Sequence, residues 1–229
     1  MRYDRRMCGR ASLTTPDWET IRAILDAAPD EEEAAAWTPR YNVAPTQLHP
    51  ILRVVDGQRR LQRAGWGLPS SFVSGEHRTV INARVETVAS RPMWREALAE
   101  RRCVVPVDGF FEWQGEQPYW FHRADGGLLL LAGLWEPGPA PPGEIARARF
   151  VVITCPPNAL VAAAHDRMPA ILPPACIADW LARPAVDVIA PAPEDALVAT
   201  PVSTRVNSPA NDDARLLEPV RPRTQLSLF

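Results

Sequence analysis

Three aromatic and aliphatic runs in the middle of the chain constrain its fold more than any other feature. They cover residues 104–113, 119–123 and 128–135, and the short connections between them contain Gly115-Glu116 and Asp125-Gly126-Gly127. β-Branched and aromatic residues favour strands, while glycine and aspartate favour tight turns. The pattern predicts an antiparallel meander.

The flanking sequence adds a hairpin and several helices. Residues 48–55 and 60–68 flank Asp56-Gly57, a typical hairpin turn. A helix is expected from Thr15-Pro16 to about Ala28, because a hydroxyl cap precedes a proline in the first turn. We expect further helices over 90–101, 158–164 and 174–181, and a buried strand over 150–155. Because strands and helices do not alternate regularly, we predict the α+β class, with an antiparallel sheet or barrel core and flanking helices.

Composition narrows the class of protein. The 229 residues carry a net charge of −2, and no lysine occurs among the 25 basic residues. A strongly basic protein that coats nucleic acid is therefore excluded, and any contact with DNA must be confined to a local patch. The four cysteines are far apart and form no CxxC pair, so we expect neither disulfides nor a metal site. We expect a soluble, cytoplasmic monomer without a cofactor, a membrane span or a secretory signal.

Five short sequence blocks occur in a fixed order along the chain. They are Met7-Cys8-Gly9-Arg10, then residues 40–45 (RYNVAP), 82–87 (NARVET), 108–113 (DGFFEW) and 165–169 (HDRMP). Together they resemble the SOS response-associated peptidase (SRAP) family over residues 7–210. The resemblance implies the fold of that family in one domain, residues 7–214. It also implies an enzyme of the DNA-damage response that captures abasic sites in single-stranded DNA, localised at the nucleoid and replication fork.

The resemblance implies that Cys8 is the reactive residue and that its α-amine is free. An α-amine has a pKa of roughly 7.7–8.0 and can form an imine with an aldehyde, after which the thiol closes a thiazolidine ring. Six residues precede Met7. We interpret residues 1–6 as a leader or a misassigned start, because an acylated Cys8 nitrogen cannot form this ring. The family is also thought to be autoproteolytic.

Three further polar residues are candidate catalytic groups. Glu112 ends an apolar strand, where desolvation would raise its pKa and suit it to proton transfer. Histidine is the common acid–base residue of enzymes, which makes His165 the second acid–base candidate. Asn82 can both donate and accept, which suits it to orient Cys8 and the opened sugar. The alternative roles are an exposed strand-end carboxylate for Glu112, a structural histidine for His165 and a turn asparagine for Asn82.

Arginines and aromatic residues are the candidate DNA contacts. A guanidinium matches phosphate oxygens, and an aromatic ring can stack on a base. Trp66 reads equally well as a core residue, and the wedge that the family carries is replaced here by Ser70-Ser71-Phe72. His49, His77 and His122 are expected to be surface or structural, and the remaining cysteines to lie in the core. The predicted DNA-binding set is Arg10, Arg84, Arg167, Trp66, Trp113, Phe72 and Thr154.

The last residues resemble the short peptide by which bacterial repair proteins bind the sliding clamp. We expect residues 215–229 to be a flexible tail that presents Gln225, Leu226, Leu228 and Phe229 to that partner. The alternative is an edge strand packed on the protein's own sheet.

Two other functions remain open from the sequence. Cys8, His165 and Glu112 are also the components of a thiol peptidase, including an autopeptidase, if they converge in space. A non-catalytic reader of single-stranded or modified DNA would use the arginines and aromatic residues alone.

Overall fold

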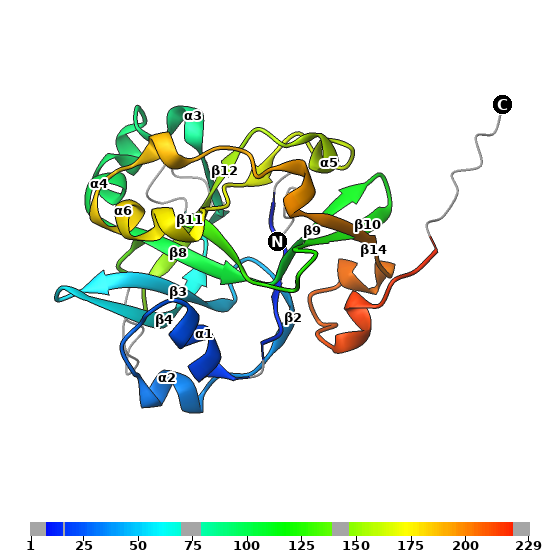
Figure 1. Cartoon of the computed structure of the whole chain (residues 1–229), viewed down its shortest axis with the longest axis horizontal. Coiled ribbons are helices and arrows are strands. Elements are labelled where there is room, and N and C mark those ends of the chain that lie inside the picture. The colour runs from blue at the N-terminus through cyan, green and yellow to red at the C-terminus, as the bar shows by residue number, and fades with distance from the viewer. Residues whose placement is uncertain (1–7, 16, 70–78, 139–146, 222–229) are drawn as a thin grey trace.

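Two β-sheets, one of them closed into a barrel, make up most of the protein (Figure 1). The computed structural model describes residues 8–15, 17–69, 79–138 and 147–221. The strands are β1 Ala11–Leu13, β2 Arg40–Val43, β3 Leu48–Val55, β4 Gln58–Trp66, β5 Leu68–Pro69, β6 Thr79–Val80, β7 Asn82–Arg84, β8 Arg102–Val107, β9 Gly109–Gln114, β10 Gln117–His122, β11 Leu129–Glu136, β12 Arg149–Cys155, β13 Met168–Pro169 and β14 Val198–Pro201.

The helices are short and lie around the sheets. The α-helices are α1 Trp18–Ile24, α2 Glu31–Ala35, α3 Val85–Val88, α4 Pro92–Glu100, α5 Ala159–Ala162 and α6 Ile177–Ala182. The 3₁₀ helices are η2 Pro174–Cys176, η3 Val186–Val188, η4 Glu194–Ala196, η5 Thr204–Asn207 and η6 Ala214–Leu217. Within the described ranges, no helix combines the length and the apolar character needed to cross a membrane.

The barrel consists of β11, β8, β3, β4 and β12, and a pairing between β11 and β12 closes the ring. Neighbouring barrel strands are antiparallel except for β12 and β4, which are parallel, and β12 also runs parallel to β7 outside the ring. Side chains such as Leu52, Val104 and Phe150 are fully buried in the main hydrophobic core. The predicted α+β class with a largely antiparallel barrel is confirmed.

The second sheet is open, with the strand order β14-β10-β9-β1-β2. β9 and β10 form the predicted hairpin, but β11 pairs with β8 and β12 instead of β10. The expected meander is therefore wrong as a single sheet. The run over residues 104–113 is two strands, and the chain passes from the barrel to the open sheet between Val107 and Gly109.

Asp108 fixes this crossing between the two sheets. Its carboxylate accepts hydrogen bonds from the Ser12 hydroxyl and from both the backbone N–H and the hydroxyl of Thr14. Gly109 follows, and a Cβ at this position would lie 2.0 Å from Nε1 of Trp120. That Nε1 donates to the Ser12 hydroxyl at 3.0 Å. The residues around Asp108 thus hold β1 against β9.

The predicted β3–β4 hairpin is confirmed, whereas the start of the first helix is not. Asp56 and Gly57 adopt φ values of 50° and 74°, as a tight turn between twisted strands requires. The first helix begins at Trp18, not at Thr15, because the carboxylate of Asp17 accepts from the backbone N–H groups of Glu19 and Thr20. An aspartate cap of this kind satisfies amides that the helix itself leaves unpaired.

Ordered packing continues beyond residue 214, where we expected the domain to end. Leu216 is fully buried in a second apolar cluster with Phe111, Val202 and Val206. The backbone N–H of Val220 donates to the carbonyl of Pro201 at 2.9 Å. The described part of the expected tail is therefore attached to the open sheet.

Candidate active site

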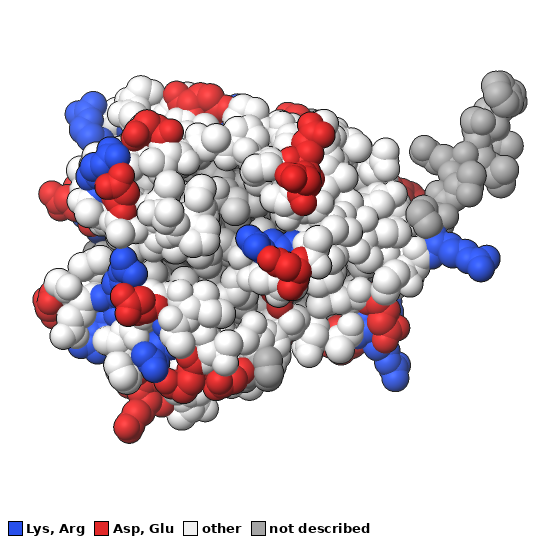
Figure 2. All heavy atoms as spheres, viewed as in Figure 1, with Lys and Arg blue, Asp and Glu red and all other residues white. Residues whose placement is uncertain are grey.

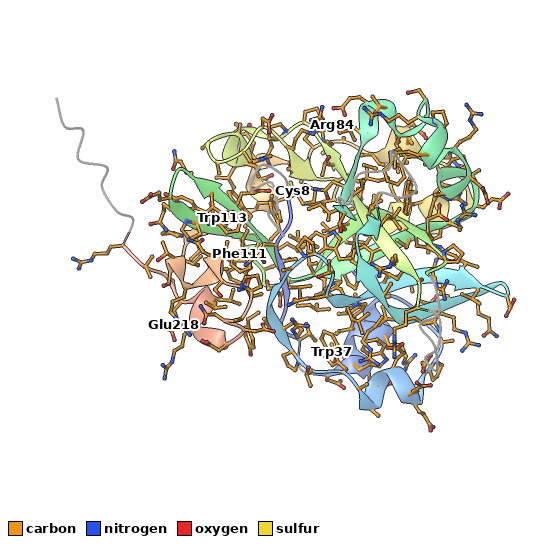
Figure 3. All side chains as sticks on the ribbon, turned by 180° about the vertical axis from the view of Figure 1, so that it is seen from behind. Cys8, Trp37, Arg84, Phe111, Trp113 and Glu218 are labelled. Carbon is orange, nitrogen blue, oxygen red and sulfur yellow. The ribbon has the colours of Figure 1, made fainter. Side chains whose placement is uncertain are left out.

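Cys8 lies where the open sheet meets the barrel. The β1–β9 pairing aligns Ala11 with Phe110, and the N–H of Phe111 donates to the carbonyl of Arg10 at 3.0 Å. This register carries the segment before β1 past Glu112. Figure 3 shows Cys8 between the open sheet, which bears Trp113, and the β7–α3 segment, which bears Arg84.

Three candidate catalytic side chains converge at this point. A ligand atom of each of Cys8, Glu112 and His165 lies within 4.8 Å of the others. Cys8 is 4% exposed and Glu112 is 1% exposed. His165 follows α5 and comes from the barrel side, so the cluster is assembled from three distant parts of the chain.

Burial controls the protonation of the cluster. Desolvation raises the pKa of Glu112 to about 7, although the neighbouring His165 and a hydrogen bond with Cys8 oppose the rise. The pKa of Cys8 is raised well above its ordinary value, first by burial and then by the charge of Glu112. The thiol is therefore protonated at neutral pH, while Glu112 is poised to give or take a proton.

Neighbouring groups can form hydrogen bonds with His165 in either protonation state of its ring. Its Nδ1 lies 3.0 Å from the backbone N–H of Arg167, which donates to it when the ring is neutral. The same nitrogen lies 3.1 Å from the carbonyl of Arg167 and 3.3 Å from Oδ1 of Asp166, which can accept when the ring is protonated. This environment suits a residue that transfers protons.

Asn82, at the start of β7, fixes the backbone of Cys8. Its Nδ2 donates to the Cys8 carbonyl at 3.0 Å. Its Oδ1 is buried and has no hydrogen-bond partner among the residues that the structure describes. An unpaired buried acceptor is costly, so this oxygen is available to a hydroxyl of a bound substrate.

The three predicted arginines differ in their surroundings. Arg167 forms a double hydrogen bond with Glu86 and donates to the carbonyl of Thr154 at 2.7 Å. Arg10 donates to Oδ1 of Asn42 at 2.8 Å and to the Val206 carbonyl, and burial lowers its pKa to about 10. Arg84 alone is exposed.

Two of the predicted DNA contacts, Trp66 and Thr154, have side chains that lie inside the protein. Trp66 is 4% exposed, stacks on Phe150 and donates to the carbonyl of Ile81. Thr154 is 3% exposed and faces the carbonyl of Ala83. Trp113 is partly exposed, with its Nε1 bonded to Asn207. Phe72, Gln225, Leu226, Leu228, Phe229 and residues 1–7 lie outside the described residues.

Sequence reasoning missed two acidic residues beside the cluster. Glu86 pairs with Arg167, and this contact is the first cause that lowers the pKa of Glu86. Asp166 lies beside His165 and raises the pKa of Glu112. Both residues lie inside blocks that we had singled out, so a search for charge partners of the arginine and histidine in those blocks could have found them.

Surface charge is mixed on the face drawn in Figure 2. Figure 2 shows one face on which arginine and acidic side chains are interspersed over a largely uncharged surface. A cavity of about 140 Å³ lies between α2 and the β3–β4 hairpin, and Glu33 and Arg63 pair across its wall. It shares no residue with the cluster around Cys8.

Comparison with known proteins gives consistent matches across the chain. The family-level sequence model described as SOS response associated peptidase (SRAP) matches residues 7–209. The chain is 34% identical to abasic site processing protein YoqW of Bacillus subtilis, covering 93% of this chain and 99% of the relative. It is 30% identical to abasic site processing protein YedK of Escherichia coli, covering 93% of this chain and all of the relative.

Vertebrate proteins and solved structures match as well. Abasic site processing protein HMCES of Gallus gallus is 30% identical, covering 93% of this chain and 78% of the relative. A crystal structure of a Bacteroides thetaiotaomicron protein superposes with a TM-score of 0.78 at 24% identity, covering 93% of this chain and all of that one. A Bordetella bronchiseptica structure gives 0.70 at 27% identity, with coverage of 86% and 100%.

Proposed function

The chain belongs to the SOS response-associated peptidase (SRAP) family, and from this membership we propose that it processes abasic sites in DNA by covalent capture on Cys8. The substrate class is taken from relatives that are named abasic site processing proteins and match over 93% of this chain. The observation that carries the chemistry is the convergence of Cys8, Glu112 and His165 within 4.8 Å.

The first step is attack of an amine on the aldehyde of the ring-opened abasic sugar. No side chain can supply that amine, because the chain contains no lysine. The α-amine of Cys8 supplies it when Cys8 is the first residue, and its pKa of roughly 7.7–8.0 leaves part of it neutral at pH 7. The nitrogen bonds to the aldehyde carbon, and loss of one water gives an imine.

The second step closes the ring. The Cys8 sulfur bonds to the imine carbon, the proton leaves the thiol, and the imine nitrogen gains a proton. Glu112, with a pKa of about 7, can accept the thiol proton and return it to nitrogen. The sum is aldehyde plus cysteine giving a thiazolidine plus water. Both nucleophiles sit on one residue, so ring closure has a high effective molarity.

His165 and Asn82 assist from the barrel side. His165 has partners for both protonation states and protonates the leaving hydroxyl in imine formation. Asn82 holds the Cys8 carbonyl and offers Oδ1 to a sugar hydroxyl. Arg84, exposed at the rim, contacts a phosphate, and Trp113 offers a partly exposed ring to a flanking base.

The test compares two forms of the protein, one beginning at Cys8 and one retaining residues 1–7. The form beginning at Cys8 should give a heat-stable complex with single-stranded DNA that carries one abasic site. The longer form should not, because its Cys8 nitrogen is an amide. Equal yields from both forms would exclude the thiazolidine route. Cys8→Ala distinguishes covalent capture from non-catalytic DNA binding, because a protein that only binds DNA would keep its full affinity for DNA.

A thiol peptidase is the second candidate, favoured by the same convergence of thiol, imidazole and carboxylate. The protonation state of the Cys8 thiol argues against this candidate. A peptidase needs a thiolate, usually obtained by lowering the cysteine pKa, whereas burial and Glu112 raise the pKa of Cys8. Cleavage of a peptide substrate, or removal of residues 1–7 from the chain, in the absence of DNA and dependent on Cys8 would favour this candidate.

A further inference from the structure

We propose that the cluster of Cys8, Glu112 and His165 is also a binding site for a zinc ion, and that a bound zinc ion blocks capture of abasic sites. The inhibitory part rests on the function proposed above, whereas the binding site itself does not. Nothing in the spacing of these residues along the chain suggests a metal site, because they are far apart in sequence.

The donor set is one that zinc prefers. A thiolate, an imidazole and a carboxylate are its usual ligands, and catalytic zinc sites use three protein ligands with an open fourth position. The softness of the thiolate disfavours magnesium and calcium, which take oxygen ligands. No other group of three such donors is found among the described residues.

The geometry requires only side-chain adjustment. A tetrahedral zinc ion with bonds of about 2.0–2.3 Å holds its ligand atoms roughly 3.5 Å apart. The three ligand atoms here already lie within 4.8 Å of one another. Shifts of about one ångström therefore close the site, which is within the reach of rotations about the side-chain bonds of Glu112 and His165.

A second observation points to a missing ligand at this place. Glu112 is 1% exposed, and its Oε1 has no hydrogen-bond partner in the described part of the chain. A buried carboxylate oxygen without a donor is expensive, and a cation bonded to it would remove that cost. The orphaned oxygen belongs to the residue that also contacts the Cys8 thiol.

The surroundings provide the outer contacts that a metal-bound histidine needs. Ligation of zinc through Nε2 of His165 leaves Nδ1 to donate to the carbonyl of Arg167, 3.1 Å away. Such a contact fixes the ring and its tautomer in many metal sites. On binding, the sulfur–hydrogen bond of Cys8 breaks, a sulfur–zinc bond forms, and the proton passes to solvent. The thiol is then no longer available to an imine.

Metal binding is measured first, without DNA. The full chain and the form beginning at Cys8 are titrated with cobalt(II), whose tetrahedral thiolate complexes absorb in the near ultraviolet and visible. Zinc affinity follows from displacement of the cobalt. We expect one ion per chain and a thiolate-to-cobalt band that Cys8→Ser abolishes. Cys176→Ser is the matched control, because Cys176 is partly exposed and outside the cluster; this variant should keep the band.

The other two ligands are tested with Glu112→Gln and His165→Ala, each checked for an unchanged circular dichroism spectrum. Loss of one ligand should weaken zinc binding by tenfold or more. An unchanged zinc affinity in both variants, or a cobalt band that survives Cys8→Ser, would overturn the site.

Capture is measured second. Zinc should inhibit adduct formation by the form beginning at Cys8 with the same constant as the measured zinc affinity, and a chelator should restore the rate. If the cobalt band depends on Cys8 but no adduct ever forms, the proposed function fails and the zinc site stands. If the adduct forms and zinc neither binds nor inhibits, the zinc site alone is refuted.

Discussion

The side-chain amide of Asn82 donates to the backbone carbonyl of Cys8 at 3.0 Å, and this contact ties β7 to the segment that carries the proposed nucleophile. The bond holds the cysteine backbone while leaving the thiol and the nitrogen to react. Its loss should therefore affect the rate of capture more than the affinity for DNA.

Substitution of Asn82 tests this positioning role. Asn82→Ala removes a hydrogen bond worth about 1 kcal/mol, so the single-turnover rate of adduct formation should fall by roughly five- to tenfold. Asn82→Asp should slow the reaction more, because a carboxylate would then oppose the Cys8 carbonyl. Affinity for undamaged single-stranded DNA is the control and should stay constant. A full rate in Asn82→Asp would exclude the positioning role.

Substitution of the two acid–base residues should separate chemistry from binding. Glu112→Gln and His165→Ala should slow formation or reversal of the adduct by roughly 10²–10⁴-fold. The glutamine variant should retain its thermal stability, because a neutral amide replaces a buried carboxyl that lacks a partner on one oxygen. Parallel losses of DNA binding and of chemistry would instead mark these residues as structural.

The predicted arginines should behave differently from one another. Arg84→Ala should weaken DNA binding and reduce the salt-dependence slope by about 0.7, the value for one contact to a single strand. Arg10→Ala should mainly destabilise the protein, by about 1.5–3 kcal/mol in chemical denaturation, because its charged bonds to Asn42 and Val206 join the segment before β1 to β2 and to η5. Arg167→Ala should show both effects, since its guanidinium is paired with Glu86. An unchanged slope in Arg84→Ala would remove it from the DNA contact.

The burial of His49 should lower the stability of the folded protein in acid. Burial lowers its pKa from 6.5 to about 4, and its Nε2 donates to the Pro106 carbonyl at 2.7 Å. Above pH 6.5 the ring is neutral in both the folded and the unfolded state, so its full contribution is present. As the pH falls from 6.5 to 4, only the unfolded state gains the proton, and the free energy of unfolding should fall by about 3 kcal/mol.

Urea denaturation at pH 7 and pH 4 measures this contribution. His49→Gln keeps a donor for Pro106 but cannot take up a proton, so the loss between the two pH values should be smaller by about the same amount. If the variant and the wild type lose equal stability, His49 is not the source of the acid sensitivity.

Clamp binding by the last residues stays a proposal, because Gln225, Leu226, Leu228 and Phe229 lie outside the described residues. Deletion of residues 225–229 should abolish binding to a purified bacterial sliding clamp in calorimetry, with a micromolar dissociation constant for the intact chain. The melting temperature and capture on a short oligonucleotide should not change. A destabilised deletion variant would favour the edge-strand alternative instead.

Local sequence patterns predicted those turns, helices and strands whose formation depends on neighbouring residues in the chain. The Asp56-Gly57 turn, the helix around Trp94 and the buried strand ending at Cys155 all follow from turn chemistry or apolar periodicity. The path of the run over residues 104–113 could not be predicted in this way. The break at Asp108 depends on hydrogen bonds from Ser12 and Thr14, which are about a hundred residues away in the chain.

The same limit applies to the candidate site. Cys8, Glu112 and His165 could be selected from short blocks, but their convergence depends on how two sheets meet. For Trp66 the sequence left two positions open. A tryptophan beside glycines is compatible with a base-stacking platform and with a core position, and only its packing on Phe150 decides between them.

Because the site is divided between two sheets, its residues come together in a fixed order during synthesis of the chain. During synthesis Cys8 leaves the ribosome long before Asn82, then Glu112, then His165. The open sheet is complete only when its edge strand β14, near residue 200, has been made. A nascent chain therefore carries its cysteine for most of its synthesis without the groups that would assist a reaction. Under the proposed mechanism, assisted reaction of Cys8 with an aldehyde begins only after His165 has been made and the two sheets have come together.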